Sequence, residues 1–376
     1  MLGLSSSGEL VGIPRCYKKP TTTRSHPYYI FFALGFPVGT TLFSTALAIT
    51  IYFAGLVVFR LYFSPLAKFP GPKLAAATSW YEFYYDYWCN GQYIFQIEKM
   101  HRKYGPILRV NPEELSIHDP SFYNQLYVTE SRRRTNSYEL FCKGIDFDGS
   151  HLLTSDHDLH RKRRKPLEPF FSRQGITKLQ PMIAEVALQL ESRFKESKGT
   201  GKVIRLDHAC SAFSGDIIGR ICLGGDEPGQ RFLDDPDFAP DWYNVIHTIV
   251  RSIPLFTGFP SIIWILRLVP ERLLLWAFPQ GQMFNIFKQR AIQEIQKAQD
   301  RAYSQNNDSN SIFTHIIRSD MPESERSAER LSKEAQVLLG GGTASTARTI
   351  VFASFYILSR PVIRERLAKE LKDIMA

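Results

Sequence analysis

The hydropathy pattern begins with a long gap in charge, because no charged residue occurs between Tyr28 and Phe59. After Pro37 the run VGTTLFSTALAITIYFAGLVVF has the roughly 20 residues that a helix needs to cross the hydrocarbon of a bilayer. We therefore expect a transmembrane anchor over residues 28–62, preceded by a polar, basic tail over residues 1–27. A cleaved signal peptide is disfavoured because the run is long and begins late. A buried core helix of this length rarely lacks charge.

Turn signals and helical periodicity alternate after the anchor. Pro65, Pro70 and Pro72 exclude helix from SPLAKFPGPKLAA and predict a stiff hinge. The segment YGPILRVNPEELSIHDP alternates apolar and polar residues around Pro112, which predicts two short strands in a hairpin. The expected fold class is therefore mainly α with a small β region. Helical spacing of apolar residues recurs over residues 178–198, 280–302, 331–358 and 361–376.

One strongly apolar segment, Ile253 to Pro279, fits two roles. It holds only three charged residues and is broken by prolines. Core packing explains this composition, and we prefer that interpretation. The alternative is a surface that dips into the bilayer and guides apolar substrate inward.

Composition narrows the class of protein further. A content of 44% hydrophobic and 13% aromatic residues excludes intrinsic disorder. The five cysteines form no C-x-x-C pair and no dense framework, which indicates a reducing compartment for most of the chain. The net charge of +9 suits an anionic partner, such as nucleic acid, a lipid surface, an acidic protein or an acidic cofactor.

The stretch LLGGGTASTARTI, Leu338 to Ile350, combines three glycines with small and hydroxyl residues. A phosphate-binding loop is excluded because no lysine follows the glycines and the preceding EAQVLL is helical in character. Within a helix the three glycines cost about 2–3 kcal/mol relative to alanine. Either a ligand approaches the bare backbone, or the glycines allow close packing against another helix. These two interpretations stay open on the stretch alone.

A basic cluster occupies SDHDLHRKRRKPLEPFFS, Ser155 to Ser172. His160 and Arg164 are four residues apart, so on a helix they share one face and could jointly bind a carboxylate or phosphate. A solvated basic face is the alternative. We expect no nucleic-acid binding, because the chain is membrane-anchored. A metal site is disfavoured because no convergent fourth ligand accompanies the nearby histidines.

Cys222 lies in GRICLGG, between Arg220 and Gly224. A nearby cation lowers the pKa of a thiol, so this setting could favour a thiolate. The competing interpretation is an ordinary helix end with the glycines as a stop signal, and we prefer it.

Five segments in order, from Phe69 to the last residue, resemble a membrane-bound cytochrome P-450 of the fungal type, a haem-thiolate monooxygenase. They are FPGPKLA, KYGPILRVNPEELSIHDP, HRKRRKPLEPFFS, RLSKEAQVLLGGGTASTA and LSRPVIRERLAKEL. The nearest subgroup is the one that contains trichodiene oxygenase. The resemblance implies an incomplete cytochrome P-450 fold after one transmembrane helix, with residues 63–376 as the N-terminal two-thirds of the catalytic domain.

The resemblance assigns roles to six residues and implies haem b as cofactor. Ser345 takes the place of the threonine that hydrogen-bonds iron-bound dioxygen, with Thr346 beside it, while Ala344 replaces the usual acid. Gly341 and Gly342 line the helix groove over the haem. Arg164 matches the arginine that pairs with a haem propionate. His160 stands where the family has tryptophan, and its imidazole N–H could still donate.

The resemblance also implies partners and a location. The basic run on the cluster helix faces the NADPH-cytochrome reductase that supplies electrons, an inference from charge complementarity. The substrate is an apolar small molecule, and the anchor contacts membrane lipid. The family places such chains in the endoplasmic reticulum membrane as single-pass proteins with a cytosolic globular part. The basic residues on both sides of the anchor leave the orientation undecided by charge.

Two family motifs are missing from the sequence, the Glu-x-x-Arg pair of a later helix and the F-x-x-G-x-R-x-C-x-G loop. ESRR at Glu130 and ESER at Glu323 match the first by chance, and Cys222 lies too early to replace the thiolate. We therefore expect a C-terminally truncated chain with no metal ligand of its own. The predicted function is hydroxylation or epoxidation of an apolar molecule such as a terpenoid. The alternative is an inactive membrane-anchored remnant that binds a partner.

Overall fold

The computed structural model describes residues 38–127, 133–137, 149–224, 231–259, 280–303 and 311–375, with residues 265, 268–270, 272–273 and 276. The chain divides into two compact units, Met1–Ser64 and Pro65–Ala376. The predicted tail over residues 1–27, the first part of the predicted anchor and about half of the apolar segment Ile253 to Pro279 lie outside the described residues.

In the described part of the first unit, helix α2 (Val38–Val58) runs into the π-helical turn η1 (Phe59–Phe63). Residues Gly39–Phe63 form a span with a mean hydropathy of 2.2, and no residue of its most apolar part is buried in the protein. Thr45 and Thr50 donate hydrogen bonds from their hydroxyls to carbonyls one turn back, at 2.8 Å in both cases. The helix is therefore long and apolar enough to cross a bilayer, and it carries few unsatisfied polar groups.

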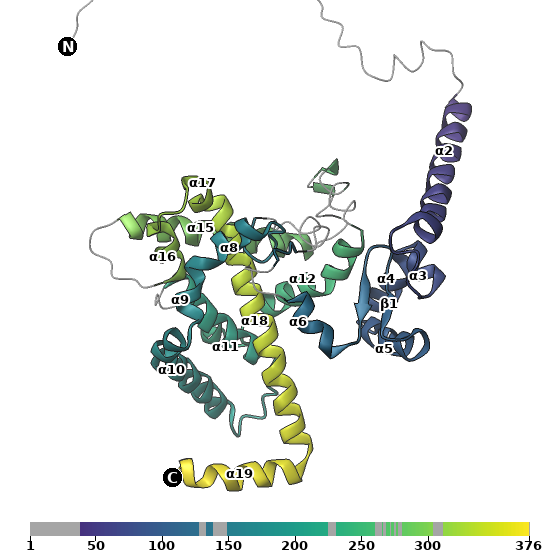
Figure 1. Cartoon of the computed structure of the whole chain (residues 1–376). Helices are drawn as coiled ribbons and strands as arrows, with labels where there is room; N and C mark the ends of the chain where they lie inside the picture. The colour runs from purple at the N-terminus through teal and green to yellow at the C-terminus, as the bar shows by residue number, and fades with distance from the viewer. Residues whose placement is uncertain are drawn as a thin grey trace, which may run out of the picture. The chain divides into compact units, whose positions relative to one another are not determined.

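The second unit begins with short helices and a hairpin (Figure 1). The predicted hairpin is confirmed, because β1 (Ile107–Arg109) pairs antiparallel with β2 (Leu115–Ile117). The prediction of a helix-free hinge was wrong at its end. Helix α3 (Lys73–Ala77) begins directly after Pro72, which serves as its N-cap, a place where proline leaves no backbone donor unsatisfied. The elements around the hairpin are α4 (Trp80–Phe83), η2 (Tyr84–Trp88), α5 (Tyr93–Tyr104), η3 (Pro120–Phe122) and α6 (Tyr123–Leu126).

Helices make up nearly all of the remaining described chain. The predicted helices over residues 178–198, 280–302, 331–358 and 361–376 are confirmed within a few residues at each end. The helical elements in order are α8 (His157–Arg164), η4 (Lys165–Leu167), α9 (Glu168–Phe171), α10 (Arg173–Ser197), α11 (Leu206–Leu223), η5 (Phe232–Asp234), α12 (Pro240–Gly258), α15 (Gln280–Tyr303), α16 (Ile312–Arg318), α17 (Glu323–Arg326), α18 (Ala328–Ser359) and α19 (Pro361–Met375).

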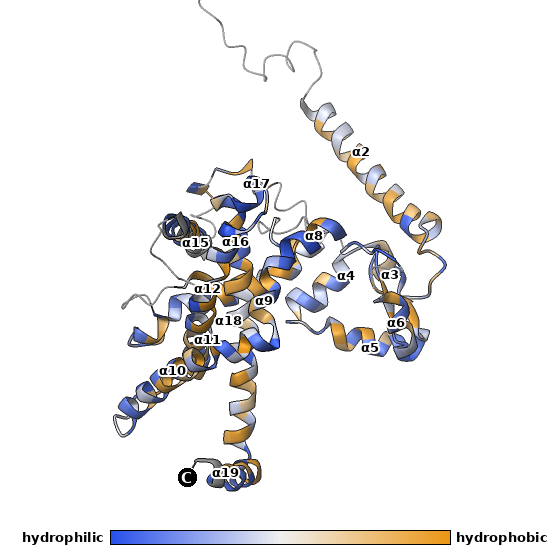
Figure 2. Cartoon of the chain, turned by 60° about the vertical axis from the view of Figure 1, so that its left-hand side comes forward, coloured by the Kyte–Doolittle hydropathy of each residue, from blue (hydrophilic) through white to orange (hydrophobic). Residues whose placement is uncertain are grey.

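The main core forms around the first half of α18, which packs chiefly against α11 and then against α15. Hydrophobic residues concentrate along α11, α12 and α18, whereas α8 is mostly hydrophilic (Figure 2). Leu331, Ala335, Phe313, Ile295 and Leu167 are fully or almost fully buried in this core. The predicted fold class, mainly α with a small β region, is confirmed.

Candidate functional site

The glycine stretch lies in the middle of α18, which continues through it without a break. A Cβ atom added at Gly342 would lie 2.7 Å from Cγ1 of Ile218 on α11. A Cβ atom at Gly341 would meet no atom within 4 Å, and Gly341 is exposed. The two interpretations of the stretch therefore apply to different residues: Gly342 allows close helix packing, and Gly341 leaves the backbone open to a ligand.

Hydroxyl groups extend the open face next to Gly341. The Ser345 side chain is exposed, and its Oγ donates to the carbonyl of Gly341 at 2.8 Å. Thr349 repeats this bond one turn later, from its Oγ1 to the carbonyl of Ser345 at 2.9 Å. Thr346 is also exposed. Because the Ser345 proton is already donated within the helix, its oxygen is available as an acceptor for a ligand.

Helix α8 carries the second group of predicted residues. It begins at the N-cap Asp156, whose carboxylate accepts from the backbone N–H of Leu159 at 2.8 Å. The guanidinium of Arg164 lies over the ring of Phe171, 5.8 Å from its centroid. Its Nη1 atom is buried and has no hydrogen-bond partner in the part of the chain that the structure describes. A buried guanidinium nitrogen without an acceptor is well suited to a carboxylate ligand.

The geometry at His160 corrects the expectation that its N–H is available to a ligand. The Nδ1 atom of His160 lies 2.9 Å from the carbonyl oxygen of His151. A carbonyl oxygen only accepts, so Nδ1 carries the proton and donates it to His151. A neutral imidazole has one N–H, and in this ring it is already engaged.

A buried network of charged side chains connects α8 to α18. Arg163 on α8 donates from Nε and Nη2 to both carboxylate oxygens of Glu325 on α17, at 2.8 and 2.9 Å. Arg330 lies between two acids, 3.1 Å from Glu325 and 2.8 Å from Glu334. Glu334 in turn accepts from the backbone N–H of His151 at 3.1 Å and from its Nδ1 atom. The loop before α8 is therefore held by α18 through paired charges.

The two arginines and two glutamates of this network balance in charge, and both hydrogen bonding and burial change their pKa values. The hydrogen bond from Arg163 lowers the pKa of Glu325. Burial lowers the pKa of Arg330, against the effect of the two neighbouring carboxylates. Glu334 is fully buried, so each of its partners compensates for lost hydration.

Our sequence reasoning missed this network. Arg330 and Glu334 are four residues apart, a visible signal for a pair on one helical face. Glu325 belongs to the ESER segment, which the sequence suggested to be a chance match to a family motif. His151 lies 183 residues from Glu334 in sequence, and no local pattern predicts such a contact.

The structure supports the helix-end interpretation of Cys222. Gly224 has a φ of 68° and caps α11 in the left-handed conformation. Cys222 is fully buried, and burial strongly raises the pKa of its thiol. Arg220 pairs with Glu185 at 3.1 Å. The thiolate interpretation of this setting was wrong, because burial and the negative charge of Glu334 both raise the pKa of the thiol.

The described residues offer partners for two parts of a haem group, its carboxylates and one face of its ring, but not for the iron. Arg164 offers a carboxylate partner, and the exposed backbone at Gly341 with the Ser345 hydroxyl offers an open helix face. Among the described cysteines, burial raises the pKa of Cys210 to about 11 and that of Cys222 further, while Cys89 is half-buried far along the chain from both segments. No thiolate for the iron side is therefore found in the described ranges.

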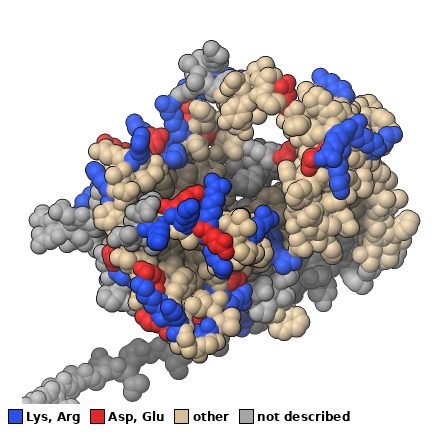
Figure 3. Space-filling model, turned by 90° about the horizontal axis from the view of Figure 1, so that it is seen from below, with Lys and Arg blue, Asp and Glu red and all other residues tan. Residues whose placement is uncertain are grey.

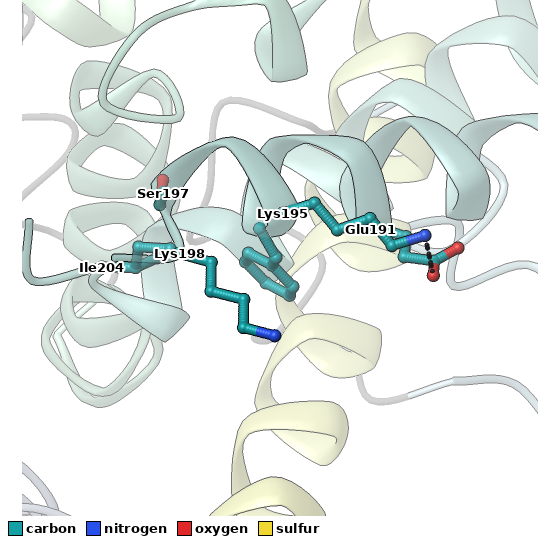
Figure 4. A pocket seen from close by; sticks show the side chains of 6 residues that line it. Glu191, Lys195, Ser197, Lys198 and Ile204 are labelled. Carbon is teal, nitrogen blue, oxygen red and sulfur yellow. Dashed lines mark ion pairs between the residues drawn. The ribbon is translucent and has the colours of Figure 1, made fainter. Parts of the chain in front are cut away.

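Two other surface features are separate from these residues. A hollow of about 500 Å³ lies at the end of α10 and is shown in Figure 4. Its lining includes the pair of Glu191 and Lys195, 2.7 Å apart, and none of the predicted site residues. On the face seen in Figure 3, Lys and Arg side chains lie among Asp and Glu, so this face is not uniformly basic.

Comparison with known proteins identifies the family. The cytochrome P-450 family model matches residues 75–376. Cytochrome P-450 monooxygenase oblB of Aspergillus clavatus is 48% identical over 356 residues, covering 92% of this chain and 68% of its own length. The chain belongs to the cytochrome P-450 family, as its ordered motifs predicted.

Two further relatives carry more specific names. Fusicoccadiene C-8 hydroxylase of Phomopsis amygdali is 46% identical, covering 85% of this chain and 62% of its own length. Stellatic acid synthase of Emericella variicolor is 41% identical, covering 87% and 58%. The chain thus spans about three-fifths to two-thirds of the length of these relatives.

Proposed function

We propose that the protein is a haem-dependent monooxygenase that hydroxylates or epoxidises an apolar small molecule of the terpenoid class. Its membership of the cytochrome P-450 family and the names of its relatives support this function. The observation that carries the proposal is the open face at Gly341 and Ser345 on a helix whose other side is buried in the core. A flat cofactor needs such a face, because an added side chain would hold it away from the backbone.

Each residue of the site has a role in this proposal. Arg164 would hold a carboxylate of the haem through its buried Nη1 atom. Gly341 would allow the ring to approach α18, and the Ser345 oxygen would accept a hydrogen bond from a ligand above it, with Thr346 beside it. When bound, the haem supplies the activation of dioxygen. Ala344 has no ionisable group, so it cannot supply a proton to Ser345, whose exposed side chain is open to solvent.

Electron supply would come from an NADPH-cytochrome reductase. Arg161, Lys162 and Lys165 are exposed on and just after α8, whereas Arg163 is engaged with Glu325. Three exposed cations at the end of a short helix suit an acidic protein surface, and they mainly accelerate its association. The apolar helix α2 is compatible with a membrane anchor, and we place the protein in the endoplasmic reticulum membrane with its second unit in the cytosol.

The terpenoid class is taken from the relatives. One is named for hydroxylation of fusicoccadiene and another for the synthesis of stellatic acid. The half-buried Ala344 adds apolar surface beside the hydroxyl row, and the exposed Arg348 of the same helix lies over the ring of Phe352.

The test is product formation in yeast microsomes that contain a matching reductase. The protein is incubated with terpene hydrocarbons and NADPH, and mass spectrometry follows the gain of one oxygen atom. Replacement of Ser345 by alanine is expected to lower the rate roughly 100-fold, the range for loss of a positioned proton-transfer group. Thr349→Ala removes the same kind of helix bond one turn away and should leave the rate within about twofold. Absence of product where a known family member is active would favour an inactive, partner-binding protein.

A further inference from the structure

The open face of α18 continues beyond the hydroxyl of Ser345. Four exposed residues, spaced three or four positions apart, lie along this one side of the helix: Gly341, Ser345, Arg348 and Phe352. The guanidinium of Arg348 lies 5.5 Å from the centroid of the Phe352 ring. The face therefore presents bare backbone, a hydroxyl, a permanent cation and an aromatic ring, in that order along the helix.

The charge of Arg348 is not balanced by an acid in the described part of the chain. On α11, the carboxylate of Asp207 is already bonded by Arg205, at 3.3 and 2.6 Å. Burial raises the pKa of Tyr243 on α12, as do the charge and hydrogen bond of Asp207, and the positive charges of Arg205 and Arg348 act against this rise. Arg348 thus lies near an acid whose charge is matched by another arginine.

A ligand that covers this face removes water from the guanidinium. Arg348 lies seven residues after Gly341, about 10 Å along the helix axis, which is within the length of one small molecule. The contact with the Phe352 ring satisfies none of the N–H donors of Arg348. Desolvation of an unpaired cation is costly unless the ligand brings an acceptor, and a pure hydrocarbon brings none.

The shape and the charge of a single guanidinium favour a carboxylate as this acceptor. A carboxylate matches the planar fork of an arginine with two parallel hydrogen bonds. A diphosphate carries more negative charge than one arginine balances. Arg205, the other cation that acts on Tyr243, is engaged with Asp207.

We propose that the ligand of the α18 face is a terpenoid that carries a carboxylate, and that Arg348 binds this carboxylate and so positions the apolar skeleton. The inference rests on the proposed function for the terpenoid class. Arg348 is then a specificity-determining residue, whereas Ser345 keeps its role at the reacting end of the substrate. The two residues are about 4.5 Å apart along the helix axis, so the carboxylate is held about one turn from the Ser345 hydroxyl.

The probes share one tricyclic skeleton and differ in charge. Dehydroabietic acid carries a carboxylate at neutral pH, its methyl ester is uncharged, and dehydroabietylamine carries an ammonium group. Equilibrium dialysis measures the binding of each probe to the full chain in nanodiscs of neutral phospholipid, with empty nanodiscs as the blank. The acid should bind roughly 10- to 100-fold more tightly than the ester, the value of a charge-assisted hydrogen bond.

Substitutions at position 348 test the assignment by changing its charge. Arg348→Gln should remove the preference for the acid without weakening the binding of the ester. Arg348→Glu should reverse the order, so that the amine binds more tightly than the acid. Both substitutions are at an exposed position and should leave the fold intact, which circular dichroism checks.

Arg360→Gln is the matched control. Arg360 is also exposed and also lies over an aromatic ring, 5.1 Å from the centroid of Tyr356. It ends α18, about 18 Å along the helix axis from Arg348. The variant therefore loses the same charge and the same kind of ring contact, but should retain the full preference for the acid.

The microsomal assay separates positioning from catalysis. An interaction that holds the substrate equally in the ground state and the transition state changes KM and leaves kcat unchanged. Arg348→Gln is therefore expected to raise KM for the acid roughly 10-fold, with kcat within about twofold of the wild type. Ser345→Ala should act on kcat instead.

Three outcomes would count against these ideas, each in a different way. Equal binding of the acid and the ester, unchanged in Arg348→Gln, would overturn the role of Arg348 and leave the proposed function intact. Tighter binding of geranylgeranyl diphosphate than of the acid, lost in Arg348→Gln, would contradict the carboxylate. Absence of binding by every probe, together with no oxygenated product in the microsomes, would refute the proposed function itself.

Discussion

The adjacent glycines Gly341 and Gly342 on α18 have different roles, and a single substitution at each position can test them separately. A side chain at Gly342 would collide with Ile218, at 2.7 Å from its Cγ1. Gly342→Ala is therefore expected to lower the free energy of unfolding by about 1–3 kcal/mol, the cost of overpacking. Gly341→Ala meets no neighbour and should raise it by up to about 1 kcal/mol through helix propensity. Urea denaturation followed by circular dichroism measures both changes.

A double variant of Gly342 and Ile218 provides a control for the packing role of Gly342. Combining Gly342→Ala with Ile218→Ala removes the colliding atom, so part of the stability lost in the first variant should return. Strict additivity of the two single effects would show that the residues do not press on each other and would contradict the packing role of Gly342.

Asp216 gives α11 a pH-dependent contribution to stability. It is buried and accepts from the backbone N–H groups of Phe232 and Leu233 at 2.7 and 3.0 Å. Burial raises its pKa to about 6, despite these bonds. The folded state thus binds the proton more tightly than the unfolded state. The contribution is complete below about pH 4 and is lost as the pH rises through about 6, with a magnitude of roughly 2–3 kcal/mol.

Thermal melts across this pH range test the assignment. Asp216→Asn should flatten the loss of stability between about pH 4 and pH 6. It should also cost some stability at every pH, since an amide has one acceptor oxygen for two donors. Asp320→Asn changes an exposed aspartate outside α11 and the turn that follows it, and should leave the pH profile as in the wild type. An unchanged profile in Asp216→Asn would assign the pH dependence to another group.

At the scale of elements, the charge network connects α8 and the loop before it to α18. Glu334→Ala removes the partner of Arg330 and both bonds to His151. An uncompensated buried charge costs about 3–5 kcal/mol of unfolding free energy. Glu329→Ala, an exposed glutamate on the same helix, should change it by less than about 0.5 kcal/mol. Chemical denaturation of both variants tests whether the charge network stabilises the contact between α8 and α18. Equally small effects of the two substitutions would show that it does not.

Local patterns predicted the elements well and their contacts poorly. Helices α10, α15, α18 and α19 and the hairpin follow from periodicity and turn residues, because these signals act over a few residues. The separate roles of Gly341 and Gly342 depend on where α11 lies, which no local pattern contains. The donor of His160 is lost to a carbonyl nine residues away, and that bond depends on a loop held from α18.

At the scale of the whole molecule, the lack of a thiolate among the described cysteines defines a spectroscopic expectation. Cys222 is buried as a thiol, and the described residues offer no other thiolate near the two site segments. The 376-residue polypeptide expressed by itself is therefore expected to show no thiolate-type absorption band when it is reduced under carbon monoxide. A clear band would show that a cysteine of this chain reaches the iron. Cys222→Ala would then identify whether Cys222 is that ligand.

The contact of Gly342 with Ile218 has a consequence for variation in this protein. The two glycines are consecutive, so they point about 100° apart around the helix axis. Gly342, which allows α18 to pack closely against α11, therefore fixes the direction in which the neighbouring Gly341 faces a ligand. A change of side chain at Ile218 on α11 is therefore expected to rotate the open face of α18 without altering a residue on that face. A substitution in the core could then change the selectivity for one substrate over another, although the substituted residue does not contact the substrate.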